Sequence, residues 1–288
     1  MAQYLPILYA IAALGGLGIL FGLVLGLADQ KFSVETDERV SAVRAAVSGA
    51  NCGACGYAGC DAYAEAVVRG EARANACTPG GERTVKAIAA VMGVHAEALE
   101  PLVARVRCQG TCERVTPRYD YSGVPSCRAA SSISGGPNAC EFGCVGLADC
   151  LAACAFGAIA MLDGVAVVDG DVCNGCGMCV PACPRGVIQM LPRDQTVVVM
   201  CRNEAVGRIA RLQCRTACTG CKRCEKACPS ASIRVMRGVA EIDEATCTRC
   251  GACIPVCPMD CIVNFYERDP VGEAAATAQA RLLDPDDD

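Results

Sequence analysis

The N-terminal part of the chain is an apolar run of 24 residues, Leu5 to Ala28, that contains no charged side chain. A helix of this length spans about 36 Å, more than the hydrocarbon core of a bilayer, which is roughly 30 Å thick. A cleaved secretory signal has a basic N-terminal region and a shorter apolar stretch, whereas residues 1–4 carry no basic side chain. The pattern therefore predicts an uncleaved transmembrane anchor.

Helical periodicity continues after this run, in a more polar context. Valines recur at helical spacing over residues 40–47, and two further helical patterns, at 61–69 and 82–92, end at Gly70 and Gly93. These patterns predict a small helical domain.

From residue 127 the pattern changes to short apolar segments, and the sequence repeats at an offset of 74 residues that superposes nine cysteines. In the first copy, Ile159 to Leu162 is followed by a turn at Asp163-Gly164 and by Val165 to Val168. In the second copy, Ile233 to Met236 is followed by a turn at Gly238. Each copy is thus predicted to place one β-hairpin between two runs of cysteine.

Composition identifies the chemistry of these cysteines. The chain has 26 cysteines but no Trp, 12 other aromatic residues and a single His, His95. The cysteines are too closely spaced for a disulfide scaffold, and imidazole-based zinc sites are nearly excluded. A net charge of −5 argues against nucleic acid as a partner. Metal bound by thiolates is the favoured interpretation.

The first group of cysteines has the spacing C-x2-C-x4-C-x16-C, with glycines that let the backbone wrap closely around a bulky ligand. Three clustered thiols and one distant thiol favour a 4Fe–4S cluster over structural zinc, whose ligands usually come as two pairs. The predicted ligands are Cys52, Cys55, Cys60 and Cys77.

The second repeat contains two C-x2-C-x2-C-x3-C-P runs, the signature of a two-cluster ferredoxin. In such runs the first three thiols bind one cluster and the fourth binds the other. One predicted set is Cys218, Cys221, Cys224 and Cys257, and the other is Cys228, Cys247, Cys250 and Cys253.

The first repeat departs from this signature at Leu147, which replaces one thiol. One set is complete, with Cys154, Cys173, Cys176 and Cys179. The other set lacks one ligand, to which we assign Cys140, the nearest cysteine in sequence. Cys127 and Cys108 remain alternatives for this ligand. That set is Cys140, Cys144, Cys150 and Cys183.

Twenty cysteines are thus assigned as ligands of about five 4Fe–4S clusters, and the presence of a sixth cluster is left as an open alternative. The role of the remaining cysteines is unassigned: Cys108, Cys112, Cys127, Cys201, Cys214 and Cys261.

The expected fold is α+β, with an N-terminal transmembrane helix, a small helical 4Fe–4S domain and two tandem two-cluster ferredoxin-like modules. The expected boundaries are 1–30 for the anchor, 31–100 for the helical 4Fe–4S domain, 101–126 for a linker, 127–200 for module 1, 201–266 for module 2 and 267–288 for an acidic flexible tail.

This order of anchor, N-terminal site and ferredoxin modules resembles the B subunit of the Rnf complex, a membrane oxidoreductase that couples ferredoxin oxidation and NAD reduction to Na+ or H+ translocation. The resemblance is carried by NCGACGYAGC at 51–60 with Cys77, by ACEFGCVGLADC at 139–150, and by the ferredoxin runs that end at Cys183 and Cys257. With two ferredoxin modules, the chain is similar to the longer B subunits of some anaerobes.

The resemblance implies an iron–sulfur protein that takes electrons from reduced soluble ferredoxin and relays them through 4Fe–4S clusters to other Rnf subunits. It also implies a single-pass protein of the cytoplasmic (inner) membrane, with its cluster domains in the cytoplasm. The sequence has no G-x-G-x-x-G motif after a strand, and no ionisable acid or base within residues 5–28. NAD chemistry and ion transport are therefore expected in other subunits.

Charge suggests where ferredoxin binds. Residues 201–249 contain ten basic and five acidic side chains, whereas the equivalent residues 127–175 contain one basic and five acidic. A basic surface attracts an acidic ferredoxin, although the same cations also offset the charge of the module's own clusters.

Two other functions are kept as alternatives. One is a polyferredoxin subunit of another membrane enzyme, such as a hydrogenase or a formate dehydrogenase, which has no need of the C-x2-C-x4-C-x16-C site. The other is a zinc-bound assembly scaffold, which lacks the brown colour of iron–sulfur protein.

Overall fold

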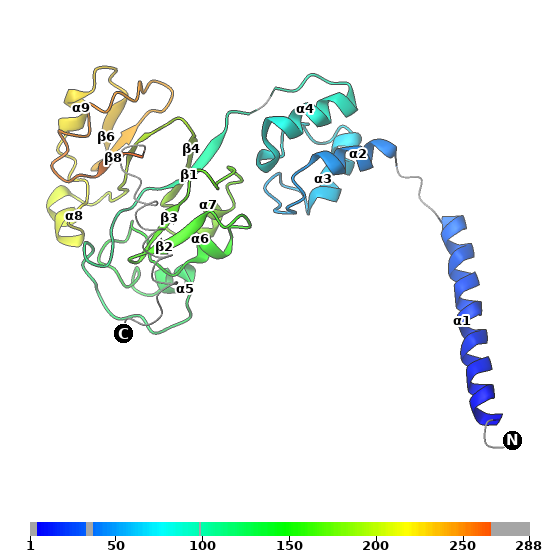
Figure 1. Ribbon diagram of the computed structural model, residues 1–288. Helices are drawn as coiled ribbons and strands as arrows, with labels where there is room; N and C mark the ends of the chain where they lie inside the picture. The colour runs from blue at the N-terminus through cyan, green and yellow to red at the C-terminus, as the bar shows by residue number, and fades with distance from the viewer. Residues whose placement is uncertain (1–4, 33–36, 98, 266–288) are drawn as a thin grey trace, which may run out of the picture.

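The computed structural model describes residues 5–32, 37–97 and 99–265, without the side chains of 5–8, 10–12, 29, 30 and 32. Figure 1 shows a single long helix, then a small helical domain, then a larger part that contains all the strands of the described residues. The expected acidic tail, residues 267–288, lies outside the described residues.

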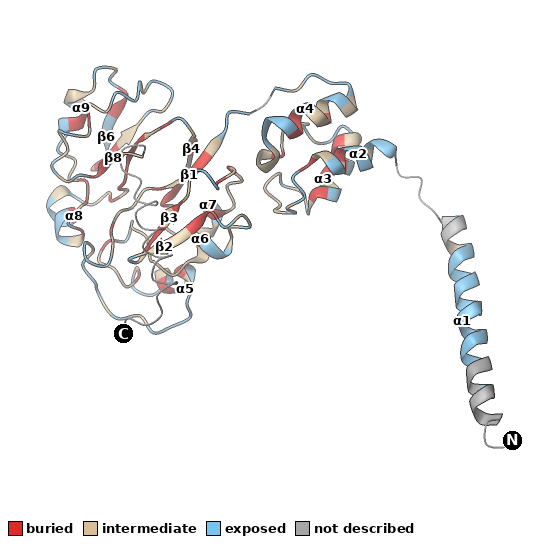
Figure 2. Cartoon of the chain, viewed as in Figure 1, coloured by how far each residue is buried: buried red, intermediate tan, exposed pale blue. Residues whose placement is uncertain are grey.

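The first element is helix α1 (Leu5–Phe32), which covers the apolar run. Its described large apolar side chains are exposed, as the pale blue helix of Figure 2 shows. Among the described residues, no helix has both the length and the apolar character needed to cross a membrane.

The helical domain consists of α2 (Glu38–Ala46), α3 (Cys60–Val68), the 3-10 turn η2 (Thr78–Gly80) and α4 (Gly81–Met92), close to the helices expected from periodicity. Asp37 caps α2, because its side chain accepts a hydrogen bond from the N–H of Arg39. Val43, Tyr63 and Ile88, one from each helix, are buried together and form the centre of the core. Two cysteines, described below, complete that core.

Module 1 contains two two-stranded antiparallel sheets. Strand β1 (Leu102–Val106) pairs with β4 (Ile188–Pro192), and β2 (Ile159–Leu162) pairs with β3 (Val165–Val168). Three short helices, α5 (Cys127–Ser132), α6 (Asp149–Ala152) and α7 (Cys179–Ala182), carry cysteines. The structure differs from expectation at β1, which lies in the segment expected to be a linker. Its buried Val103 and Val106 belong to the core of this module.

Module 2 follows the same plan. Strand β5 (Val197–Val199) pairs with β8 (Ile262–Asn264), and β6 (Ile233–Met236) pairs with β7 (Val239–Ile242). Its helices are α8 (Gly207–Gln213) and α9 (Arg223–Ala227). Strand β5 precedes the expected boundary at residue 201, because the first strand of each module has to pair with the last.

The two modules are in direct contact. Arg107, which follows β1, donates hydrogen bonds to the carbonyl oxygens of Val199 at 3.3 Å and Ala240 at 3.4 Å. Both acceptors belong to module 2, so this side chain links the modules.

Equivalent glycines hold one cysteine loop of each module against its hairpin. A Cβ atom at Gly146 would lie 2.6 Å from the carbonyl oxygen of Gly164, and one at Gly220 would lie 2.9 Å from that of Gly238. Gly146 and Gly220 also have positive φ, of 88° and 65°. Only glycine fits both requirements.

We therefore expect Gly220→Ala to destabilise module 2 by about 1–3 kcal/mol more than Gly251→Ala. Gly251 is the matched control, because its φ of 73° is similar but a Cβ there meets only the side chain of Ile254 at 3.6 Å. Denaturant unfolding followed by the visible absorbance of bound iron measures the difference. Equal stability of the two variants would show that the close approach to Gly238 has no importance.

Candidate iron–sulfur centres

All 26 cysteines lie within the described residues, and each is a free thiol. Nowhere in the described part of the chain do three or more His, Cys, Asp or Glu side chains gather closely enough to hold one metal ion. The cysteines instead surround several cavities.

Module 2 brings both expected sets together. The first set lines a cavity of about 310 Å³ and the second a cavity of about 290 Å³, including the part open to solvent. We call them the Cys218 set (Cys218, Cys221, Cys224 and Cys257) and the Cys228 set (Cys228, Cys247, Cys250 and Cys253).

Module 1 also brings together its complete set, which we call the Cys154 set (Cys154, Cys173, Cys176 and Cys179). Burial raises the pKa of Cys179 to about 11, and the neighbouring thiols of the set contribute to the shift. The N–H of Ala104, in β1, donates to the sulfur of Cys173 at 3.5 Å. Strand β1 therefore contributes to the site as well as to the core.

The other set of module 1 differs from the expected one. Cys127, at the start of α5, lines a cavity of about 340 Å³ with Cys144, Cys150 and Cys183, and Cys140 does not line it. We call these four residues the Cys150 set. Cys140 lies in a separate cavity with Cys108, Cys201 and Cys214. Proximity in sequence favoured Cys140, but α5 brings the more distant Cys127 to this cavity.

The N-terminal set (Cys52, Cys55, Cys60 and Cys77) lies in the helical domain. Cys60 is the first residue of α3 and Cys77 precedes η2, and both are buried in the core with Tyr63. Burial raises the pKa of Tyr63 to about 12, and the nearby Cys77 and Cys55 add to the shift. The structure thus places three of the expected residues around Tyr63. Cys52 lies near Cys176 of module 1.

Three family models match the segments that carry these sets. One described as "Putative Fe-S cluster" matches residues 49–79, and two described as "4Fe-4S dicluster domain" match residues 172–233 and 217–261. The matches support 4Fe–4S clusters as the cofactors.

Relatives match along most of the chain. The B subunit of the Na(+)-translocating ferredoxin:NAD(+) oxidoreductase complex of Acetobacterium woodii is 46% identical over 262 residues, which are 91% of this chain and 79% of the relative. The B subunit of the ion-translocating oxidoreductase complex of Methanosarcina acetivorans is 41% identical, over 88% of this chain and 96% of the relative. The chain belongs to this family, the B subunits of Rnf complexes. It is an iron–sulfur electron-transfer subunit of an oxidoreductase.

A third relative agrees with this assignment. The B subunit of the proton-translocating ferredoxin:NAD(+) oxidoreductase complex of Clostridium ljungdahlii is 38% identical, over 85% of this chain and 88% of the relative.

Burial keeps many of the thiols protonated when no metal is bound. Desolvation raises the pKa of Cys150 to about 12 and that of Cys224 to about 11. A cluster binds thiolate, so its assembly has to release these protons, and assembly is favoured as pH rises.

Cys261 was singled out by no sequence motif. Its side chain is 1% exposed, and its sulfur lies 3.5 Å from that of Cys257. Hydrogen bonds to Cys218 and Cys257, together with burial, raise the pKa of Cys261. The same contacts lower the pKa of Cys218 and of Cys257 to about 6. Cys261 thus keeps its proton between two members of the Cys218 set, and its single S–H can donate to one of the two sulfurs at a time.

Hydrogen bonds to cluster sulfurs stabilise the more negative, reduced state. We expect Cys261→Ala to lower the midpoint potential of one cluster by roughly 20–60 mV, since 59 mV corresponds to about 1.4 kcal/mol for one electron. Cys261→Ser, which retains a donor, is the matched control and should restore part of the shift. Potentiometric titration followed by electron paramagnetic resonance (EPR) tests this. A wild-type potential in Cys261→Ala would exclude the hydrogen-bonding role.

Proposed function

We propose that this chain accepts electrons from reduced soluble ferredoxin at module 2 and relays them towards other subunits of an Rnf complex. The complex as a whole would couple ferredoxin oxidation and NAD reduction to Na+ or H+ translocation, as the names of the relatives state for those proteins. NAD reduction and ion transport belong to other subunits.

Five clusters are part of this proposal. A bound 4Fe–4S cluster accepts and donates single electrons. Four thiols around a cavity fit such a group in the Cys150, Cys218 and Cys228 sets. The N-terminal and Cys154 sets complete the proposed ligands, because their cysteines have the spacing of 4Fe–4S sites. Cys127 takes the place of Cys140 in the Cys150 set because of the lining of its cavity.

One observation supports the position of the ferredoxin-binding site. Cys221 of the Cys218 set is exposed, and the exposed cations Lys222, Arg223 and Lys226 follow it in sequence. None of these three cations forms an ion pair with another described residue, whereas Arg237 pairs with Glu204. The three cations therefore present positive charge beside an accessible cluster site, where an acidic ferredoxin would bind.

Reversing Lys222, Arg223 and Lys226 to Glu should slow reduction by ferredoxin at least about tenfold at low salt, because exposed charges act mainly on association rate. The difference should shrink at physiological salt, where the Debye length is about 8 Å. Stopped-flow mixing with reduced ferredoxin measures both rates, and iron content should not change.

A triple reversal of Arg73, Arg83 and Lys86, exposed residues of the helical domain, is the matched control with the same change in net charge. If both variants slow reduction equally, the effect is one of overall charge and the site lies elsewhere.

The anchor is the second part of the proposal. Residues 5–28 are uncharged, and large apolar side chains of α1 such as Leu14, Ile19 and Leu25 are at least 67% exposed in the isolated chain. Apolar side chains exposed on this scale normally contact lipid or protein. We place α1 across the cytoplasmic membrane, with the cluster domains on the cytoplasmic side.

Deletion of residues 1–28 should move the chain from the membrane fraction to the soluble fraction with its iron retained, because every cysteine lies beyond residue 51. Fractionation after a high-salt wash, with full-length chain as the control, measures the distribution. A truncated chain that stays in the membrane pellet would show that residues 1–28 do not anchor it.

A further inference from the structure

One further cavity lies where the two modules meet. Four cysteines that the five proposed sets do not use line it: Cys108, Cys140, Cys201 and Cys214. We call them the bridging set. Their cavity measures about 280 Å³, close to the 290, 310 and 340 Å³ of three proposed cluster sites. The number of thiols and the size of the cavity are thus those of a cluster site.

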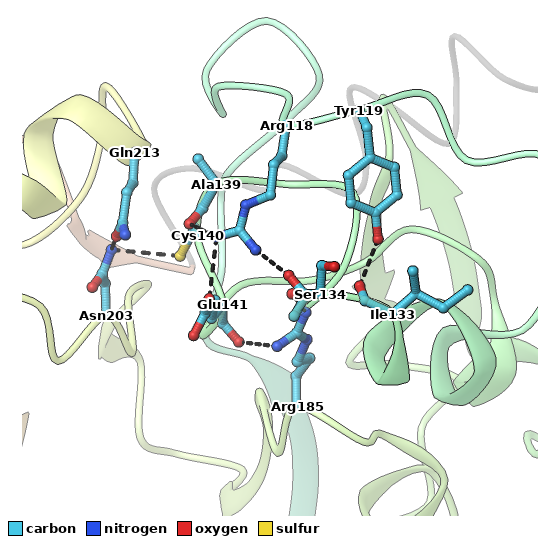
Figure 3. A network of polar contacts seen from close by, with 11 residues as sticks. Arg118, Tyr119, Ile133, Ser134, Ala139, Cys140, Glu141, Arg185, Asn203 and Gln213 are labelled. Atoms are coloured by element: carbon cyan, nitrogen blue, oxygen red, sulfur yellow. Dashed lines mark hydrogen bonds and ion pairs between the residues drawn. The ribbon is translucent and has the colours of Figure 1, made fainter.

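A buried amide is directed at these sulfurs. Asn203 is 1% exposed, and its Nδ2 donates to the sulfur of Cys140 at 3.5 Å and to Oε1 of Gln213 at 2.8 Å. Figure 3 shows this side chain between Gln213 and Cys140. The backbone N–H of Asn203 also donates to Cys201 at 3.4 Å. Donors of this kind stabilise iron-bound sulfur.

The segment that carries Cys140 is held in place by two arginines, as Figure 3 shows. Arg118 donates to the carbonyl oxygen of Ala139 at 3.3 Å and pairs with Glu141 at 3.1 Å. Arg185 donates to the carbonyl oxygen of Glu141. The backbone on both sides of Cys140 is therefore held by arginine side chains.

The bridging set contacts a cluster site of each module. The N–H of Cys144, in the Cys150 set, donates to the sulfur of Cys108 at 3.4 Å. The N–H of Cys218, in the Cys218 set, donates to the sulfur of Cys201 at 3.3 Å. One hydrogen bond thus separates the bridging set from a ligand residue on either side.

Positive charge lies beside the bridging set and offsets the negative charge of a cluster bound there. Arg107 and Arg202 line the cavity, and Arg107 also donates to the carbonyl oxygen of Cys201 at 3.5 Å. Burial lowers the pKa of Arg107, but a guanidinium stays charged at any physiological pH. A cluster with four thiolates is anionic, so a buried cation beside it offsets its charge.

The internal repeat explains why these thiols are available. Cys201 is equivalent to Cys127, and Cys221 is equivalent to Leu147. Module 1 lacks the thiol at Leu147 and uses Cys127 instead. Module 2 has Cys221 in its place, which leaves Cys201 free for another site.

We infer that Cys108, Cys140, Cys201 and Cys214 bind a sixth 4Fe–4S cluster, which passes electrons between the Cys218 set and the Cys150 set. Each transfer moves one electron, so the cluster on one side is oxidised as its neighbour is reduced, and no bond forms or breaks. The direction of flow rests on the proposed function, in which ferredoxin supplies the electrons. The existence of the site does not.

Iron counting tests the site. Anaerobically purified full-length chain should contain about 24 iron atoms, four for each of six sets. Cys140→Ser should contain about 20, whereas Cys112→Ser should match the wild type, because Cys112 is exposed and lines none of the cavities described above. A wild-type count of about 20 that Cys140→Ser leaves unchanged would overturn the sixth cluster while leaving the five proposed clusters in place.

Double variants assign the ligands. Cys140→Ser with Cys214→Ser should lose about four iron atoms, as either single variant does, because both thiols serve one cluster. Cys127→Ser with Cys140→Ser should lose about eight, because these thiols serve two. A loss of about eight iron atoms in the first double variant and about four in the second would return Cys140 to the Cys150 set and overturn the inference.

Asn203→Ala tests the site with every ligand retained, and so separates metal binding from misfolding. Iron content should stay at the wild-type value while the midpoint potential of one cluster falls. Unchanged potentials for all clusters would show that no cluster lies beside this amide.

The connection between modules needs a kinetic test. After mixing with reduced ferredoxin and rapid freezing, EPR signals of module 2 should appear at the wild-type rate in Cys140→Ser, whereas those of module 1 should appear at least tenfold more slowly. Equal rates would overturn the bridging role. Reduction of module 1 before module 2 in the wild type would contradict the proposed entry point of ferredoxin instead.

Discussion

Three thiols of a 4Fe–4S site can come from one short loop, but the fourth has to come from a distant segment, and most of the fold serves to bring it there. In module 2 the β6–β7 hairpin separates the two cysteine runs, so that Cys257 returns to the first run and Cys228 to the second. In module 1, Cys183 returns to the first run in the same way, and α5 brings Cys127 to the cavity that lacks a thiol at Leu147. In the helical domain the packing around Tyr63 places Cys77 beside Cys60. A small hydrophobic core is sufficient because each bound cluster also stabilises the fold around it.

The need for thiols from distant segments also explains the contact between the modules. Neither module contains the four bridging thiols, and each supplies part of them only when the two pack together. Arg107 links the backbones of the modules, and Asn203 directs its amide and its N–H at two of the sulfurs. Electron transfer slows steeply with distance. A cluster between the modules therefore connects the two clusters of module 1 with the two clusters of module 2 in one relay. This is the arrangement that an electron-transfer protein needs.

Much of this arrangement can be predicted from the sequence, because each hairpin turn and each cysteine motif is contained in a short segment of the chain. The hairpins lie where Asp163-Gly164 and Gly238 predict them, and both sets of module 2 follow from their motifs. Cys140 is the nearest cysteine along the chain, but Cys127 lines the cavity of the Cys150 set, because nearness in sequence does not show which segments tertiary packing brings together. The bridging set has no local motif, since its residues are spread from Cys108 to Cys214 and meet only through tertiary packing. Strand β1 was missed for the same reason, because its partner β4 lies far along the chain, with Val106 paired to Ile188.

In this arrangement, six separate sets of four cysteines bind clusters, one of them between the modules. Anomalous scattering at the iron absorption edge, from crystals of the full chain grown without oxygen, tests it most directly because iron positions are located independently of any ligand assignment. The expected result is six iron peaks, one of them enclosed by Cys108, Cys140, Cys201 and Cys214. Five peaks, with Cys140 beside the iron of Cys144 and Cys150 and none between the modules, would contradict it.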